Sequence, residues 1–427
     1  MKNIVYSIAV LLIVSCNVTN TKFATNSKDY EVYLSPHQVE TTSKHFELWN
    51  SKIKPDSVQL LSFPNIAGEY NRFFKKTGEI TYLKKAEKAL VKAVEIANMN
   101  KAGYRRALAR NYISQHRFKE ALTLAEEASN IGGGKTETQS LLFDVHMELG
   151  NYKKAEAYLD SIKDMSSFGY LIRIAKWNDY KGNLDTTITF MEKAMAKAES
   201  SKNKTLLLWS YSNIADYYGH AGRIKDSYNY YLKTLELDPQ NAYAKKGIAW
   251  IVFSYEKNGK EALRILDAVT ENYNAPDYYL LKAEISEFMN NEVAVIENMD
   301  KYYTAIKSEA HAYGDMYNAY QVEFYLNHTE QYEKALNLAL KEVMNRPTPE
   351  AYGLLAQTYY KMGKYQAALE VVENRIKGKT FEPAILYKAA EIYKANNKLE
   401  KVDALKQELL GAVYELGPAS KNEILSL

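Results

Sequence analysis

Hydrophobic and small residues along this chain recur in pairs of helix-length segments joined by short turns. The clearest pair covers residues 204–239, where Gly222 falls at the turn and Pro239 at the end. Ala215 and Ser227 stand where the two helices would cross, and tyrosines surround them at the helical period. Glycine adopts without steric cost the left-handed conformation that closes a helix, and small side chains let helices approach. The pattern therefore predicts two antiparallel helices.

The same turn pattern recurs along most of the chain. A glycine is followed two residues later by an apolar residue and five residues later by a small one, at Gly150, Gly222 and Gly363. Weaker copies bring the total to about ten units of about 34 residues each. Helix pairs of this kind hide their apolar faces only by stacking on their neighbours. We therefore expect one long repeat array.

These residues resemble the tetratricopeptide repeat (TPR) over roughly residues 64–411. The copy at 208–239 departs least from the family pattern, whereas Tyr211, Tyr352 and Gln139 stand where the family has a tryptophan. The resemblance implies an all-α fold, a right-handed TPR superhelical solenoid with a concave groove. The spacing between successive turns varies, which leaves the phase of the weaker repeats open.

Composition agrees with a folded helical protein and argues against nucleic acid as a partner. Hydrophobic residues make up 46% of the 427 residues and charged residues 25%, with only 9 prolines and 19 glycines. The net charge is +3, and residues of both signs are mixed along the chain. Nucleic-acid binding requires a concentrated basic face, which this distribution does not predict.

The N-terminus has the features of an export signal with an anchor. In residues 1–15, Lys2 precedes an apolar run at 8–14 that is too short to span a bilayer. The sequence Ile-Val-Ser-Cys resembles a bacterial lipobox, which implies lipidation of Cys16, the single cysteine; an ordinary leader with an incidental cysteine is the alternative. By resemblance to Gram-negative sorting rules, Asn17 indicates the outer membrane. The absence of a following acidic cluster slightly favours its periplasmic side.

Five parts of the chain are predicted from these patterns. They are a signal peptide at 1–15, a lipidated cysteine with a flexible tether at 16–29, an irregular N-terminal cap over the first repeat at 30–63, the TPR solenoid at 64–411, and a C-terminal tail at 412–427.

In the TPR family the first helix of each pair lines the groove, and the helical period then indicates which side chains face it. The expected groove residues are Arg106, Arg110, Tyr180, Trp209, Asp216, His220, Tyr317, Tyr320, Phe324, His328, Tyr360 and Tyr387. The aromatic density at 317–328 exceeds what repeat packing needs, so partner binding is expected there.

Other motifs do not predict catalysis, a cofactor or a metal. The sequence at 132–136, Gly-Gly-Gly-Lys-Thr, resembles the end of a phosphate-binding loop, but Ser129 replaces a required glycine and no strand is expected before it. The seven histidines lack zinc-site spacing, and no serine lies in a nucleophile-elbow sequence. Asn213 fits one position of a family carboxylate clamp, but Ser140 and Ile172 do not supply its basic partners.

Two hypotheses on function follow. The first is a non-catalytic, lipid-anchored TPR scaffold in a Gram-negative cell envelope, which binds another envelope protein or a peptide segment through its groove. The second is an accessory lipoprotein of a polysaccharide-utilisation system, which binds an oligosaccharide or docks to glycan-uptake machinery. In both, only the lipid anchor contacts the membrane, and fold alone does not decide between them.

Overall fold

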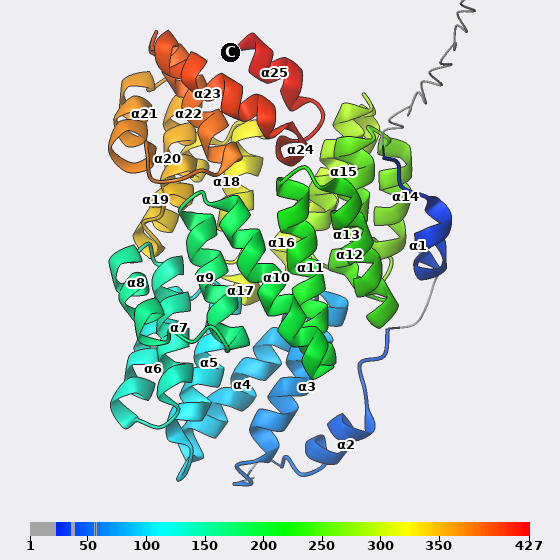
Figure 1. Cartoon of the computed structure of the whole chain (residues 1–427), viewed down its shortest axis with the longest axis vertical. Helices are drawn as coiled ribbons and strands as arrows, with labels where there is room; N and C mark the ends of the chain where they lie inside the picture. The colour runs from blue at the N-terminus through cyan, green and yellow to red at the C-terminus, as the bar shows by residue number, and fades with distance from the viewer. Residues whose placement is uncertain (1–22, 36–38, 55, 57) are drawn as a thin grey trace, which may run out of the picture.

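A computed structural model describes residues 23–35, 39–54, 56 and 58–427 of the chain. These residues contain 25 α-helices and two π-helical segments, and no β-strand is found among them (Figure 1). The predicted all-α fold is therefore confirmed. Cys16 and the predicted signal peptide lie outside the described residues.

Ten antiparallel helix pairs make up the body of the described structure, which confirms the expected repeat number. The pairs are α3 (Ser62–Thr77) with α4 (Ile80–Ile96), α5 (Lys101–Ser114) with α6 (Phe118–Ile131), α7 (Lys135–Glu148) with α8 (Tyr152–Ser161), α9 (Phe168–Tyr180) with α10 (Leu184–Ser201), α11 (Lys204–His220) with α12 (Ile224–Leu237), α13 (Ala242–Trp250) with α14 (Gly259–Thr270), α15 (Asp277–Phe288) with α16 (Glu292–Ser308), α18 (Asn318–Asn327) with α19 (Tyr332–Asn345), α20 (Pro349–Lys361) with α21 (Tyr365–Val371), and α22 (Pro383–Ala395) with α23 (Leu399–Gly411).

Shorter elements complete the described chain. These are α1 (Ser27–Leu34), α2 (Lys44–Asn50), α17 (Ala310–Tyr313), α24 (Val413–Leu416), α25 (Ser420–Ser426), and the π-helical segments η1 (Ile251–Tyr255) and η2 (Val372–Ile376), which extend α13 and α21.

The pair α11–α12 shows how the repeat sequence forms its structure. Asn203 caps α11 because its side chain accepts hydrogen bonds from the first backbone N–H groups of the helix. Gly222 has a φ of +70° at the turn. Ala215 and Ser227 are both 0% exposed where the helices cross. The small residues and the turn glycine therefore have the roles that the pattern predicts.

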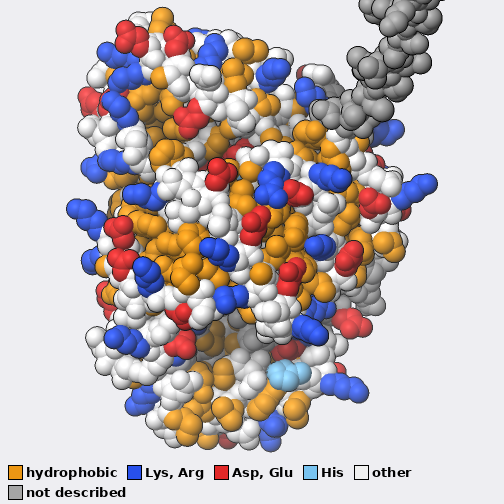
Figure 2. All heavy atoms as spheres, in the orientation of Figure 1, with side chains coloured by type: hydrophobic (Ala, Val, Ile, Leu, Met, Phe, Trp, Pro, Cys, Tyr) orange, Lys and Arg blue, Asp and Glu red, His pale blue; other side chains and the backbone are white. Residues whose placement is uncertain are grey.

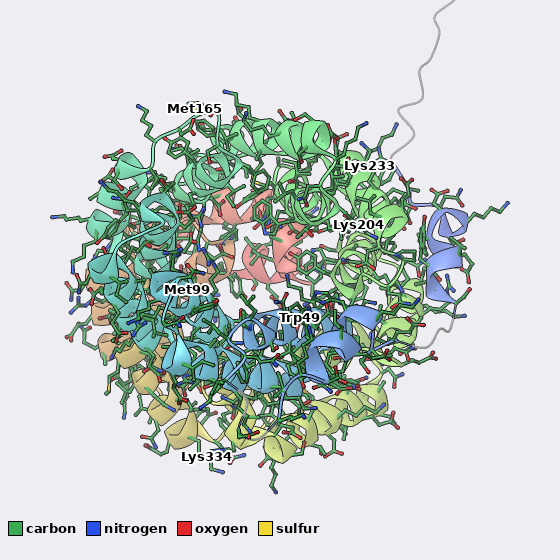
Figure 3. All side chains as sticks on the ribbon, turned by 90° about the horizontal axis from the view of Figure 1, so that it is seen from below. Trp49, Met99, Met165, Lys204, Lys233 and Lys334 are labelled. Carbon is green, nitrogen blue, oxygen red and sulfur yellow. The ribbon has the colours of Figure 1, made fainter. Side chains whose placement is uncertain are left out.

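The helix pairs wind into a right-handed superhelix of nearly two turns. Seen from below, the chain runs clockwise as it recedes, from blue through green to yellow (Figures 1 and 3). Contacts between the turns keep a constant register: the N–H of Asn274 donates to the carbonyl of Thr77 at 2.7 Å, 197 residues away. Gly150 meets Pro347 at the same separation, and Gly182 meets Phe381 in the next unit along. Six helix pairs thus complete one turn, and the second turn stacks on it.

An aromatic core fills the space between the two turns at one point of this contact. Ile80 and Leu83 of α4 share a buried cluster with Tyr302, Tyr317 and Phe324 of the second turn. Tyr317 and Phe324 are each only 7% exposed. The expectation that these two residues face a partner in the groove is therefore wrong. The aromatic density at 317–328 holds one superhelical turn against the other.

A charged contact joins the turns farther along. The Arg346 guanidinium lies 3.5 Å from the Glu148 carboxylate, which also accepts a hydrogen bond from Lys176 at 2.7 Å. Arg346 also lies over the ring of Phe118, 5.7 Å from its centroid. Burial acts to raise the pKa of Glu148, but the charges of Lys176 and Arg346 outweigh it and hold the pKa below its usual value.

The N-terminal segment packs differently from the expected tether and cap. Helix α1 contacts α12 and α14 rather than the first repeat. Tyr30 is 2% exposed and donates to Glu261 at 2.8 Å, and the Tyr228 hydroxyl donates to the carbonyl of Asn26 at 3.1 Å. Residues 23–29 are therefore not a free tether. The later part of the segment does cover the first repeat, where α2 packs on α3 and Ile53 and Leu60 pack against the same core.

The predicted C-terminal tail also forms ordered structure. Ile424 of α25 is 0% exposed and shares a cluster with Leu386 and Leu409 of the last helix pair. The short helix α24 contacts α11 and η1 of the first turn as well as α22 and α23 of the second. Residues 412–427 therefore turn back onto the superhelix.

Candidate functional site

The first helices of neighbouring pairs form a pocket in the inner wall of the superhelix. Its volume is about 190 Å³. It is lined by Asp216, Tyr231, Tyr243, Lys246, Gly247, Trp250 and Leu281. These residues come from α11, α12, α13 and α15, so that three successive repeats build the pocket.

Asp216 anchors one side of the pocket. Its carboxylate accepts hydrogen bonds from the hydroxyl of Tyr231 and, at 2.6 Å, from the hydroxyl of Tyr243. Burial raises the pKa of Asp216, although both hydroxyl donors act to lower it. Because Tyr243 is 51% exposed, its ring is accessible while its hydroxyl is fixed. The pocket therefore presents an oriented aromatic face.

Lys246 supplies positive charge on the same wall. Its ammonium group donates to Asp277 at 2.9 Å and lies 4.8 Å from the ring centroid of Tyr278. Burial and the charge of Asp277 raise the pKa of the Tyr320 hydroxyl, and the charge of Lys246 acts to lower it; the Tyr320 side chain is 43% exposed. The predicted groove residue Tyr320 therefore lies beside this ion pair.

His220 stands at the C-terminal end of α11, in the upper part of the channel. Its Nδ1 lies 2.7 Å from a carboxylate oxygen of Glu415 in α24. Burial acts to lower the pKa of His220, but Glu415, with Asp216 and Asp179, raises it above the usual value. Burial and then the charge of Glu415 raise the pKa of Glu382, which precedes α22, and the charge of His220 acts to lower it. Acidic groups from both superhelical turns therefore surround one histidine.

Glu284 of α15 lies beside Gly417 of the C-terminal segment. Burial, and secondly the charge of Glu287, raises the pKa of Glu284 to about 7. The side chain is nevertheless reached by solvent. A methyl group on Gly417 would lie 3.0 Å from its carboxylate. Glu284 therefore lines a channel that is enclosed by protein but open to water.

Two predicted groove arginines belong to α5 of the second helix pair. Arg106 donates to the carbonyl of Gly133 at 3.0 Å and to the hydroxyl of Thr138 at 3.1 Å. It therefore holds the glycine-rich loop that resembles a phosphate-binding sequence. Solvent reaches the Arg110 side chain, but the protein around it lowers the pKa of its guanidinium, an effect that the charge of Asp144 partly offsets.

Tyr180 and Trp209 pack against their neighbours outside the pocket. The Tyr180 ring stacks on Tyr152 with centroids 4.0 Å apart. Trp209 meets Phe168 edge to face at 5.8 Å and is 38% exposed. Both side chains therefore contribute to contacts between adjacent repeats.

The remaining predicted residues belong to the second turn. Tyr360 packs on Tyr365 with centroids 5.7 Å apart, and the Tyr387 hydroxyl donates to Glu423 at 3.5 Å. His328 follows the end of α18, and burial lowers its pKa. Of the twelve predicted groove residues, Asp216 lines the pocket, and the charged groups around the pocket act on His220 and Tyr320.

Sequence reasoning missed Tyr243, Lys246 and Trp250 of the pocket. The repeat period contained a signal for two of them. Tyr243 lies 34 positions after Trp209, and Trp250 lies 34 positions after Asp216. The repeat that contains them is a weak copy of the pattern, which concealed the correspondence.

The outer surface gives no sign of a nucleic-acid site on the face shown in Figure 2, where basic and acidic side chains are interspersed. Within the described ranges, no group of three or more metal-ligating side chains is arranged to hold a metal ion. Helices in the same ranges lack the combination of length and hydropathy that a membrane span requires.

Comparison with known proteins identifies the repeat in two segments. A family model for the tetratricopeptide repeat matches residues 210–241, and the model for anaphase-promoting complex, cyclosome, subunit 3 matches 328–407. No curated protein matches the chain.

Solved structures of repeat proteins show limited similarity. A tetratricopeptide repeat protein from Parabacteroides merdae ATCC 43184 is 16% identical, with 55% of this chain and 93% of that chain covered and a TM-score of 0.39. Yeast Tom70 is 13% identical, with 82% and 90% covered and a TM-score of 0.32. Together with the ten helix pairs, the family matches show a TPR solenoid, an architecture suited to protein–protein interaction.

Proposed function

We propose that this protein is a non-catalytic, lipid-anchored TPR scaffold of a Gram-negative cell envelope, which binds a segment of another protein in its inner channel. The observation that carries the proposal is the pocket between Asp216, Tyr243, Lys246 and Trp250. It combines accessible aromatic rings with fixed charges of both signs. Such a combination suits a peptide, which offers apolar side chains and polar backbone groups.

The size of the pocket supports a peptide rather than a cofactor. Pockets for small molecules commonly have volumes of about 300–1,000 Å³. A volume of about 190 Å³ accommodates one or two side chains of a longer segment. The rest of the segment would then run along the channel.

The chemistry of the lining supports binding without catalysis. The described residues that line the pocket include no serine, cysteine or histidine. Asp216 is hydrogen-bonded to two tyrosines, and Lys246 is paired with Asp277. These groups therefore serve as a fixed recognition surface rather than as a nucleophile with an adjacent base.

The proposed membrane attachment is through Cys16, on the periplasmic side of the outer membrane. Residue 23 is seven residues from Cys16, which limits the connection to about 25 Å. Because α1 packs on α12 and α14, this side of the superhelix would lie towards the membrane. Replacement of Cys16 by Ser should release the protein from membranes in cell fractionation. Unchanged fractionation and mass would contradict lipidation.

Affinity capture from an envelope extract of the source organism tests partner binding. Tyr243→Ala removes a channel ring that is 51% exposed. The control, Tyr365→Ala, removes a ring on α21 that is 46% exposed. We expect the wild type and Tyr365→Ala to recover the same partner, and Tyr243→Ala to lose it. Equal recovery by all three proteins, or no partner for any, would contradict the proposal.

A second candidate function, as an oligosaccharide-binding component of a polysaccharide-utilisation system, is supported by one feature of the same pocket. Tyr243 and Trp250 place aromatic rings beside the Asp216 carboxylate, and aromatic rings stack on sugar rings. Titration with plant and algal oligosaccharides should then change the fluorescence of Trp250. A Trp250→Phe variant identifies that signal among the four tryptophans. No change across the panel would exclude this candidate.

A further inference from the structure

The C-terminal segment occupies the upper end of the inner channel. Helix α24 contacts α11 and η1 on one side and α22 and α23 on the other. In the view along the superhelix, the red C-terminal helices lie inside the ring of first-turn helices (Figure 3). The segment therefore stands where a ligand of the channel would bind.

The backbone of Tyr414 is held by two side chains of the channel wall. Its carbonyl accepts hydrogen bonds from Trp250 Nε1 at 3.1 Å and from Ser254 Oγ at 2.6 Å. The two donors are four residues apart, at the junction of α13 with the π-helical η1. Segments of π-helix are frequent at functional sites. Because Trp250 also lines the pocket beside Asp216, the two binding features are continuous.

The ring of Tyr414 fits against a glycine on α11. A methyl group on Gly219 would lie 2.9 Å from a ring carbon of Tyr414 and 3.2 Å from its hydroxyl oxygen. Only glycine therefore leaves room for the aromatic ring at this place. Helical glycine is unfavourable relative to alanine, so the helix itself gives no reason for it.

The side chain of Glu415 meets a histidine of the same wall. Its carboxylate lies 2.7 Å from His220 Nδ1, and its side chain is 19% exposed. Asp179 and Asp216 also face His220, and their charges, like that of Glu415, act to raise its pKa. One wall thus recognises a backbone carbonyl, an aromatic ring and a carboxylate in consecutive positions.

The attachment of this segment is local. The four residues of α24 are only partly buried, whereas Gly417 and Pro418 directly after it are buried, and Leu409 before it and Ile424 after it are each 0% exposed. Gly417 has a φ of +87° directly after α24. Displacement of Tyr414 and Glu415 would therefore leave Leu409 and Ile424 buried, at the cost of the packing of Val413 and Leu416 on the same cluster.

We propose that Gly219, His220, Trp250 and Ser254 form a recognition site for an aromatic residue followed by an acidic one, and that residues 412–418 occupy it as an internal competitor. The partner is a protein segment with the same aromatic–acidic pair, and it binds by displacing α24. This inference rests on the proposed function, because it concerns the same channel.

A labelled peptide with the sequence of residues 411–418 tests the site by fluorescence polarisation. The receptors are the full-length wild type and a Tyr414→Ala, Glu415→Ala variant, in which the internal segment lacks both recognised side chains. We expect the variant to bind the peptide at least about tenfold more tightly, because the competitor is weakened. Equal affinity for the two receptors would overturn the proposal.

Two matched controls establish specificity. A peptide with alanine in place of its tyrosine should lose binding to the variant. Gly219→Ala, added to the variant, should abolish binding while α11 remains helical by circular dichroism, because alanine favours the helix. Binding that persists in both controls would show that the wall does not recognise the pair, and α24 would then be a structural cap.

This assay uses purified protein and a synthetic peptide, so its outcome is separate from that of partner capture. Capture of a partner that depends on Tyr243 would support the scaffold function. If the two receptors then bind the peptide with equal affinity, the scaffold function stands and the internal competitor is overturned. Peptide binding with the expected controls would support the recognition site even where capture recovers no partner.

Discussion

Gly78 lies directly against Ala275, which is 197 residues further along the chain. A methyl group on Gly78 would lie only 2.8 Å from the backbone nitrogen of Ala275. Gly78 ends α3 with a φ of +70°, so it also has the ordinary role of a turn glycine. This glycine thus closes a helix and admits the second superhelical turn.

Replacement of Gly78 by alanine should therefore destabilise the protein more than the same change at Gly222. Both glycines have a φ of +70°, but a methyl group on Gly222 would meet no heavy atom of the described residues within 4 Å. Gly222→Ala should cost about 1–2 kcal/mol from the left-handed backbone alone. Gly78→Ala should cost about 1–3 kcal/mol more through overpacking against backbone atoms. Urea unfolding measures both, and equal losses would contradict tight contact between the turns.

Truncation of Phe324 should lower stability much more than truncation of Tyr320. Phe324 is 7% exposed between the turns, whereas Tyr320 is 43% exposed in the channel. Phe324→Ala should lower the free energy of unfolding by about 3–5 kcal/mol, because it leaves a cavity in the core. Tyr320→Ala should lower it by less than about 1 kcal/mol. A small effect of Phe324→Ala would restore its interpretation as a groove residue.

Glu148 should make stability depend on acid pH. Its pKa in the folded protein lies below 4.5, its ordinary value, because Lys176 and Arg346 outweigh burial. The group binds fewer protons when folded, so its stabilisation is present above pH 4.5 and is lost as the pH falls through the lower folded pKa. Glu148→Gln should therefore destabilise the protein at about pH 7, and the difference should shrink below about pH 4.

Urea unfolding over this pH range provides the measurement, with Glu95→Gln as the control. Glu95 is 57% exposed and pairs with Lys92, three residues before it in the same helix, so its replacement should change stability by no more than about 1 kcal/mol. A difference for Glu148→Gln that does not change with pH would contradict the proposed linkage.

His220 should titrate above pH 6.5, its ordinary value. Glu415 in α24 and Asp216 in its own helix face it, as do Asp179 in α9 and Glu382 before α22. Because the folded pKa is raised, stabilisation of the docked C-terminal segment is complete below pH 6.5 and is lost as the pH rises through the folded pKa.

Proton NMR of the full-length protein measures this pKa, and a His220→Gln variant assigns the resonance among the seven histidines. Glu415→Gln should lower the pKa of His220, because it removes the hydrogen-bonded carboxylate. A wild-type value at or below 6.5, or no response to Glu415→Gln, would show that α24 does not hold the histidine.

The repeat architecture could be predicted because it depends on neighbouring residues. Gly222, Ala215 and Ser227 form one helix pair, and their spacing is visible within a single unit. The stacking of the turns depends on residues that lie 197 positions apart, such as Gly78 and Ala275. As turn glycines, Gly78 and Gly222 look alike, although only Gly78 contacts the second turn.

The errors at the predicted site have the same origin. Helical periodicity shows which face of α18 carries Phe324, but not that another superhelical turn covers this face. Likewise, polar composition suggested a tether for residues up to 29, whereas hydrogen bonds from Tyr30 and Tyr228 hold this segment on distant repeats. The position of Tyr414 in the channel has no local sequence signal.

Photo-cross-linking in cells of the source organism tests the central claim, that a partner binds in the inner channel, most directly. A photoreactive amino acid is placed in the full-length protein at position 243, in the channel, or at position 365, at the start of α21; the two native tyrosines have similar exposure. The proposed function predicts one protein adduct from position 243 and none from position 365. An adduct from position 365 alone, or from neither position, would contradict it.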